Sequence, residues 1–204
     1  MQIVFIFISI GSIGSGLNEF RYPQGISLDE NSDTLYIADT DNIRVVRYFP
    51  NSTSEIVAGG TFCGYAKTQL CKPTGVYFEA VTNSVIISDY TRNSVLRWII
   101  GTSEWIRLAG NVSMIGGNTS AELNGPEGIG VDVIGNLYVP DSYNNRIQFF
   151  PVGQLEGLTI AGVTGLSGSN GLLLSWPMEV IVDNQLNLYV SDTNNHRVQK
   201  FLRY

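Results

Sequence analysis

Short hydrophobic runs alternate with polar turns along this chain, and the pattern recurs about every 50 residues. Each repeat begins with a Pro-containing turn and a first apolar run. A second apolar run ends in an acid, a polar turn follows it, and a third, alternating run comes next. The four prolines are spaced 50, 53 and 51 residues apart: Pro23, Pro73, Pro126 and Pro177. The four acids are spaced 50, 52 and 51 residues apart: Asp39, Asp89, Asp141 and Asp192.

These runs predict strands, because they consist of β-branched and aromatic residues bounded by Gly, Asn, Asp and Pro. In the first three repeats a fourth run ends in Ala-Gly. Four such strands make a small antiparallel sheet with two apolar faces, which it cannot bury alone. Neighbouring sheets must therefore stack face to face around an axis, so we predict an all-β fold, a β-propeller of four-stranded antiparallel blades.

The order P-x-G, LY[IV]xD and D-[ST]-x-N-x-R-[VI] resembles the NHL repeat family of β-propellers. The fourth repeat, DTNNHRV from Asp192, fits this pattern best, and the resemblance extends over residues 17–204. Two departures stand out. The second repeat has Arg92 in the Asn position and Ser94 in the Arg position, and the fourth has Glu179 in place of the Gly of P-x-G.

The resemblance implies six blades, whereas the chain supplies about four. We expect a partial or small propeller, with a piece of a larger one favoured over a closed four-bladed ring. Residues 1–16 form an apolar N-terminal segment, followed by the repeats at 17–204. The run VFIFISIG has the length and apolarity of the strand that the fourth repeat lacks. It could complete the last blade, or the segment could be a signal peptide.

The charge pattern argues against nucleic acid as a partner. The formal net charge is −6 and the pI about 4.7, and Lys and Arg do not cluster, so the surface repels phosphate backbones. The apolar N-terminal run is too short to cross a bilayer, and we expect no transmembrane span.

Cysteines and sequons favour a secreted or extracellular glycoprotein. Cys63 and Cys71 lie in one loop segment and are predicted to form a disulfide, the alternative being a pair of reduced thiols. Three N-x-[ST] sequons fall in turn-like segments, at Asn51, Asn111 and Asn118.

The recurring acids have two interpretations. They stabilise the turn that follows and pair with nearby arginines, or they contribute oxygen ligands to a calcium ion. We favour the structural role, with the arginine partners Arg44, Arg146 and Arg197. The single histidine, His196, is interpreted as a turn residue. No catalytic motif is present, so we expect a protein that is not an enzyme and holds no cofactor or metal.

A binding surface is predicted where the loops enter the repeats. The residues before the four prolines are Tyr22, Lys72, Gly125 and Trp176, and their equivalent positions place them on one rim. Because Tyr and Trp often anchor interfaces, we predict a candidate rim at Tyr22, Lys72 and Trp176 that binds a protein or glycan. The alternative function is a metal-dependent propeller hydrolase or lyase with a central divalent cation. The several histidines of the amidating lyases that resemble this fold have no counterpart here.

Overall fold

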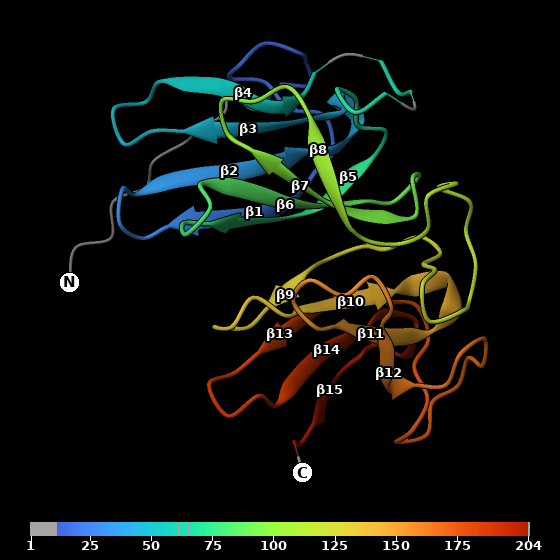
Figure 1. Cartoon of the computed structure of the whole chain (residues 1–204). Coiled ribbons are helices and arrows are strands. Elements are labelled where there is room, and N and C mark those ends of the chain that lie inside the picture. Colours follow the sequence, from blue (N-terminus) through green and yellow to red (C-terminus); the bar gives the residue numbers. More distant parts are fainter. Residues whose placement is uncertain (1–11, 61, 65, 204) are drawn as a thin grey trace, which may run out of the picture.

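The computed structural model describes residues 12–60, 62–64 and 66–203. Its fold is all-β, and each repeat forms one antiparallel sheet, here called blades 1 to 4 in chain order (Figure 1). Blade 1 consists of β1 (Pro23–Asp29), β2 (Thr34–Asp39), β3 (Arg44–Tyr48) and β4 (Ser54–Gly59). Blade 2 consists of β5 (Pro73–Glu79), β6 (Ser84–Asp89), β7 (Ser94–Ile99) and β8 (Trp105–Ala109). Blade 3 consists of β9 (Gly130–Val131), β10 (Leu137–Asp141), β11 (Arg146–Phe150) and β12 (Leu158–Gly162).

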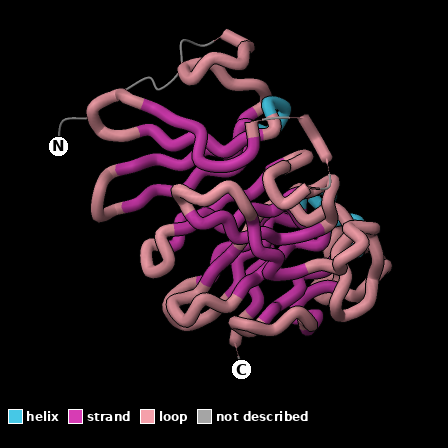
Figure 2. The backbone as a smooth tube through the Cα atoms, turned by 45° about the horizontal axis from the view of Figure 1, so that its top comes forward, coloured by secondary structure: helices cyan, strands magenta, loops and turns pink. Residues whose placement is uncertain are grey.

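Blade 4 has three strands among the described residues, β13 (Pro177–Val182), β14 (Leu188–Asp192) and β15 (Arg197–Phe201). The helical residues form single 3₁₀ turns, which Figure 2 shows at one end of the blades. These turns are η1 (Thr40–Asn42), η2 (Ser142–Asn144) and η3 (Thr193–Asn195). The predicted propeller of antiparallel blades is confirmed.

One end of every blade carries the signature residues. In blade 1, Pro23 pairs with Asp39, which pairs with Arg44 at the start of the next strand. Pro177, Asp192 and Arg197 pair in the same order in blade 4. We call this the acid end of the blades.

The hydrophobic core lies between consecutive blades, as stacked sheets require. Between blades 1 and 2, for example, the Tyr36 and Phe78 rings stack with centroids 4.5 Å apart and planes 7° from parallel. Side chains along each middle strand point alternately to the two faces of the sheet. Ile87 therefore packs in the apolar cluster between blades 1 and 2, and Ile86 packs in the one between blades 2 and 3. Burial of these apolar side chains, at roughly 25 cal/mol per Å², holds the blades together.

The glycine of P-x-G is required by the contact between blades. Neither Gly25 nor Gly75 adopts a positive φ. A Cβ added at Gly25 would lie 2.5 Å from the carbonyl oxygen of Thr74, and one at Gly75 would lie 2.8 Å from that of Glu127. The first strands of neighbouring blades therefore approach each other backbone to backbone. Glu179 replaces this glycine in blade 4, the last blade along the described part of the chain.

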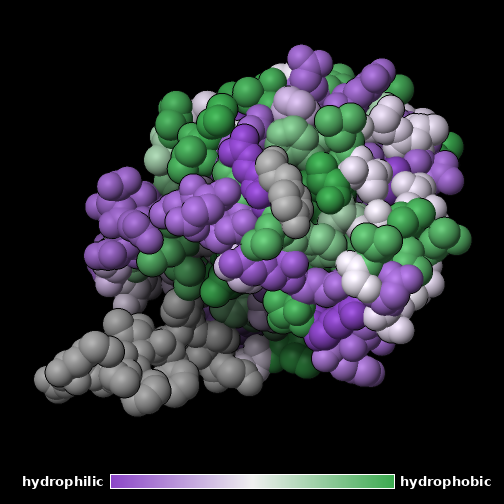
Figure 3. All heavy atoms as spheres, turned by 90° about the horizontal axis from the view of Figure 1, so that it is seen from below, coloured by the Kyte–Doolittle hydropathy of each residue, from purple (hydrophilic) through white to green (hydrophobic). Residues whose placement is uncertain are grey.

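The outward faces of the first and last blades expose apolar side chains. In blade 1 these include Ile26 and Leu28, and in blade 4 Ile181 (64%) and Val198 (69%). Figure 3 views the molecule from the side on which blade 4 lies in Figure 1 and shows hydrophobic residues among hydrophilic ones. Most of the 1–16 segment, with the proposed closing strand or signal peptide, lies outside the described residues. No helix among the residues described is long and apolar enough to cross a membrane.

Candidate functional site

The acid of each repeat is the centre of a buried hydrogen-bond cluster at the acid end. In blade 1 the Nε–H of Arg44 donates to Oδ2 of Asp39 at 2.7 Å, and the side-chain amide of Asn42 donates to the same oxygen at 2.8 Å. The other oxygen of Asp39 accepts the backbone N–H of Arg21 at 2.7 Å. Blades 3 and 4 repeat this geometry with Asp141, Asn144 and Arg146, and with Asp192, Asn195 and Arg197.

The arginine also holds the loop that enters its blade. The guanidinium of Arg146 donates to the backbone carbonyls of Asn118 (2.9 Å), Thr119 (2.9 Å) and Glu122 (3.1 Å). Burial raises the pKa of Asp141, and its hydrogen bonds and the charge of Arg146 oppose that rise. Because the acid and the arginine are fully engaged with each other and with backbone groups, this cluster positions a loop, and we call it the clasp.

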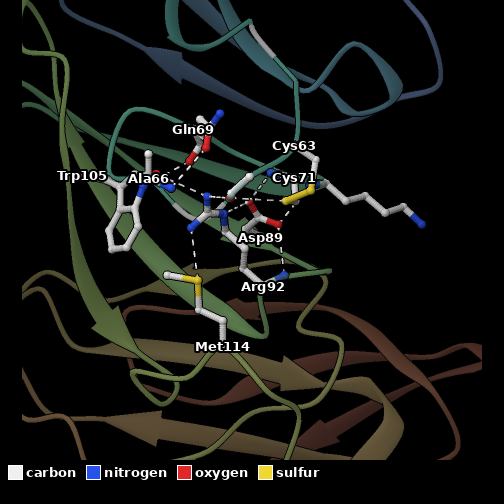
Figure 4. Close-up of a disulfide and its surroundings, with 10 residues drawn as sticks. Cys63, Ala66, Gln69, Cys71, Asp89, Arg92, Trp105 and Met114 are labelled. Atoms are coloured by element: carbon white, nitrogen blue, oxygen red, sulfur yellow. Dashed lines mark hydrogen bonds and ion pairs between the residues drawn. A yellow bond between two sulfur atoms is a disulfide. The ribbon is translucent and has the colours of Figure 1, made fainter.

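Blade 2 builds the clasp differently, as its departing sequence requires (Figure 4). Arg92 occupies the Asn position and places its Nε 3.5 Å from Oδ2 of Asp89, while its Nη2 donates to the carbonyls of Gly64 and Ala66. Cys63 and Cys71 form a disulfide in the same loop. The backbone N–H of Cys71 donates to Asp89 at 2.7 Å. Arg92 thus takes the roles that Asn and Arg share in the other blades.

The residue before the third strand of each blade adopts the left-handed conformation, and in blades 2 and 3 it links to the next blade. His196 is this residue in blade 4, with φ 54°. Asn93 accepts the backbone N–H of Gly125 at 2.8 Å, and Asn145 accepts that of Trp176 at 3.0 Å. The two asparagines therefore fix the rim positions of the following blades.

A row of contacting side chains crosses blades 2, 3 and 4 at the acid end. The Lys72 ammonium lies 4.4 Å from the ring centroid of Tyr90, whose hydroxyl donates to that of Tyr143 at 2.8 Å. Tyr143 in turn packs edge to face with Trp176 at 4.5 Å. A Cβ at Gly125 would lie 2.5 Å from the Tyr143 ring, so the glycine makes room for the row. We call these four residues the aromatic row: Lys72, Tyr90, Tyr143 and Trp176.

Next to the row, the P-x-G turns of the four blades enclose a cavity of about 300 Å³ near the axis. Its lining residues are Gln24, Gly25, Thr74, Glu127, Gly128, Met178 and Glu179. Glu127 is 8% exposed, and no described residue donates a hydrogen bond to its carboxylate. Burial raises the pKa of Glu127 to about 7, the Glu179 charge adds to the rise, and Lys72 opposes it. Desolvation likewise raises the pKa of Glu179, although part of its side chain stays open to solvent.

The predicted rim residues have different surroundings. Lys72 and Trp176 belong to the aromatic row, whereas Tyr22 is exposed and makes no ring contact with it. Sequence reasoning missed Tyr90 and Tyr143, which occupy the polar turn after the acid and not the position before the proline. It also missed Glu127, although its place as the x of P-x-G could have indicated an axial residue.

The sequons lie in exposed or half-exposed loops. Asn51 and Asn118 are exposed, and Asn111 is partly buried and donates to Glu122 at 3.0 Å. Within the described ranges, no three His, Cys, Asp or Glu side chains converge as metal ligands would.

Two stretches of the chain match the family model for the NHL repeat, residues 20–48 and 174–201. They cover the clasp residues of blade 1 and the whole of blade 4. The NHL repeat is thus matched in blades 1 and 4. A curated relative, Protein SUPPRESSOR OF QUENCHING 1, chloroplastic, of Arabidopsis thaliana, is 22% identical over 207 residues, which is 89% of this chain and 20% of that protein.

Solved structures share the propeller fold with this chain. An auxiliary nutrient binding protein of Bacteroides thetaiotaomicron has a TM-score of 0.69 and 17% identity, over 90% of this chain and 48% of that one. A chain of the nidogen/laminin complex has a TM-score of 0.67 and 18% identity, over 89% and 60%. A gluconolactonase of Xanthomonas campestris has a TM-score of 0.57 and 14% identity, over 90% and 76%.

The chain therefore spans a fifth of the curated relative and about half of the nutrient binding protein. The structures named include binding proteins and an enzyme, and at these identities they share only the fold with this chain, since propellers support many functions.

Proposed function

We propose that this chain is a non-catalytic binding module of an extracellular protein, and that the acid end of its blades binds a protein partner through the aromatic row. The observation that carries the proposal is the continuity of the row. Its four members come from three blades and lie in direct contact with one another.

The chemistry of the row supports an interface. Tyr and Trp contribute large contact areas with few rotatable bonds, and they dominate the binding energy of many interfaces. Tyr143 is 49% exposed although it packs against two other rings. Contacts within the row and the Asn145 hydrogen bond to Trp176 hold the side chains in place before a partner arrives, which lowers the entropy lost on binding.

The surroundings of the row favour binding over metal-dependent hydrolysis. The axial cavity brings together two carboxylates, Glu127 and Glu179, whereas a catalytic divalent cation needs a fuller set of oxygen or nitrogen ligands. The disulfide supports an extracellular location, because such bonds persist in oxidising compartments.

The test compares two double variants of the secreted chain. Tyr143→Ala with Trp176→Ala removes two of the row's aromatic rings, that of the exposed Tyr143 and that of the half-buried Trp176. Val81→Ala with Val133→Ala removes two exposed apolar side chains from turns at the opposite end of the blades. Proteins of the extracellular fluid are captured on the immobilised wild-type chain, identified by mass spectrometry, and titrated individually against all three proteins.

We expect the row variant to bind its partner at least about tenfold more weakly and the control to bind as the wild type does. Equal losses in both variants, or none in the row variant, would refute the proposal. A partner whose binding disappears after enzymatic deglycosylation would indicate glycan recognition by the same face.

A further inference from the structure

The axial cavity contains a buried carboxylate without a hydrogen-bond donor. Glu127 is more than nine-tenths buried, lines the cavity, and receives no hydrogen bond from any residue described. The charge of Lys72 lowers the pKa of Glu127, but the ammonium lies over the Tyr90 ring and forms no ion pair with Glu127 in the described part of the chain. Because the Glu127 carboxylate opens into the cavity and has no donor from the described residues, it is free to accept hydrogen bonds from a ligand that enters.

We propose that the axial cavity binds one arginine side chain of the partner, with its guanidinium between the carboxylates of Glu127 and Glu179. This rests on the proposed binding function of the acid end and specifies the partner's chemistry. The planar guanidinium offers five N–H donors and suits two carboxylate residues of neighbouring blades that line one cavity. The Glu179 carboxylate lies above the backbone of Gly128, the next residue after Glu127.

The size and rim of the cavity fit a single side chain. A volume of about 300 Å³ is at the lower limit of ligand pockets, so a side chain fits where a larger ligand does not. Because Lys72 contacts Tyr90 and acts electrostatically on Glu127, the row and the cavity adjoin. An arginine that enters the cavity then passes close to the rings of the aromatic row, and the faces of such rings attract its guanidinium group.

The probe is the blocked pentapeptide acetyl-Gly-Gly-Arg-Gly-Gly-amide, and the matched ligand is the same peptide with citrulline, which is similar in shape and uncharged. Binding is followed by calorimetry and by the NMR signal of the Met178 methyl group. Glu127→Gln removes the charge with little change in shape, and Glu104→Gln makes the same change on an exposed loop.

We expect the arginine peptide to bind the wild type and Glu104→Gln alike, and Glu127→Gln at least tenfold more weakly. The citrulline peptide should bind no protein measurably. The groups that act on Glu127 are Glu179, Lys72 and Tyr90. With a pKa of Glu127 of about 7, its ionised fraction and hence the peptide affinity should rise about tenfold from pH 6 to pH 8. That rise should be absent in Glu127→Gln.

Equal binding of the arginine and citrulline peptides, no binding of either, or unchanged binding to Glu127→Gln would each overturn the inference. So would calcium or magnesium chloride displacing the peptide at micromolar concentration, which would make the cavity a metal site. If Glu127→Gln keeps the affinity for a captured protein that the row variant loses, the cavity inference fails and the proposed binding function stands.

Discussion

At the scale of single residues, Glu127 shows how a repeat acquires a property that its neighbours lack. The equivalent residues in the other repeats are Gln24, Thr74 and Met178, all uncharged, so only blade 3 brings a carboxylate to this position. Its pKa of about 7 results first from burial and then from the charge of Glu179 on blade 4. Neither cause is encoded within the third repeat, since both depend on residues that the propeller brings beside it.

This shift predicts that stability increases as the pH is lowered from 8 to 5. The pKa of Glu127 in the folded chain, about 7, exceeds the ordinary value of 4.5, so the folded state binds the proton first as the pH falls. The gain in the free energy of unfolding from this group between pH 8 and pH 5 should be about 2.5 kcal/mol at most. Glu127→Gln should be the more stable protein at pH 8 and lack this part of the gain.

Urea unfolding of the wild type, Glu127→Gln and Glu104→Gln across this pH range tests the prediction. The raised pKa values of Asp89 and Asp141 contribute in the same direction in all three proteins, so the difference between profiles reports Glu127 together with its repulsion from Glu179. Parallel profiles for the wild type and Glu127→Gln would contradict the assignment.

At the scale of elements, the clasp explains why the repeated sequence pattern has an acid before a turn and an arginine after it. The acid ends one strand, the arginine begins the next, and together they fix a preceding loop, from which Asp141 accepts a bond 17 residues away and to which Arg146 donates one 28 residues away. Blade 2 keeps the acid and replaces the other two positions with Arg92 and Ser94, yet the loop is still held. The constraint is therefore on the hydrogen bonds to the loop and not on one set of residues.

The clasp arginines should differ in importance according to their burial. The side chain of Arg146 is 3% exposed and that of Arg197 is 30% exposed, while both pair with a buried acid. Arg146→Ala leaves Asp141 buried without its cation and should lower the free energy of unfolding by about 3–5 kcal/mol. Arg197→Ala should have a smaller effect, because water can reach the acid. Urea denaturation ranks the two, and an equal or reversed order would show that burial does not set the energy of the clasp.

The strands and the clasp could be predicted from sequence because their determinants recur at fixed intervals within one repeat. Asp39 and Arg44, for example, are five positions apart and are adjacent in every sheet that contains the pair. The aromatic row could not be predicted in full, since Tyr90 and Tyr143 are at different positions of their turns and meet only through the angle between blades 2 and 3. The same holds for Glu127 and Glu179, which are 52 residues apart.

At the scale of the whole molecule, stability depends on how closely the blades approach at the axis. The first strands of blades 1, 2 and 3 face the next blade through backbone atoms, with glycine at each contact. Blade 4 has Glu179 there and exposes Ile181 and Val198 on its outward face. The axial contacts and the apolar clusters between blades are thus the links that join four small sheets into one cooperative unit.

Adding one methyl group at the axis should therefore separate two blades. In Gly75→Ala the new Cβ would lie 2.8 Å from the carbonyl oxygen of Glu127 and 3.0 Å from the backbone of Gly128, atoms that cannot move without shifting blade 3. We expect a loss of about 1–3 kcal/mol of unfolding free energy. Gly171→Ala is the control, because its Cβ would meet nothing within 4 Å. Both substitutions restrict the unfolded chain equally, so their difference reports the blade contact. Urea denaturation of the two variants, with hydrogen exchange of blades 2 and 3, measures it. Equal stabilities would mean that the blades can move apart freely at the axis, and the core clusters alone would then hold the propeller together.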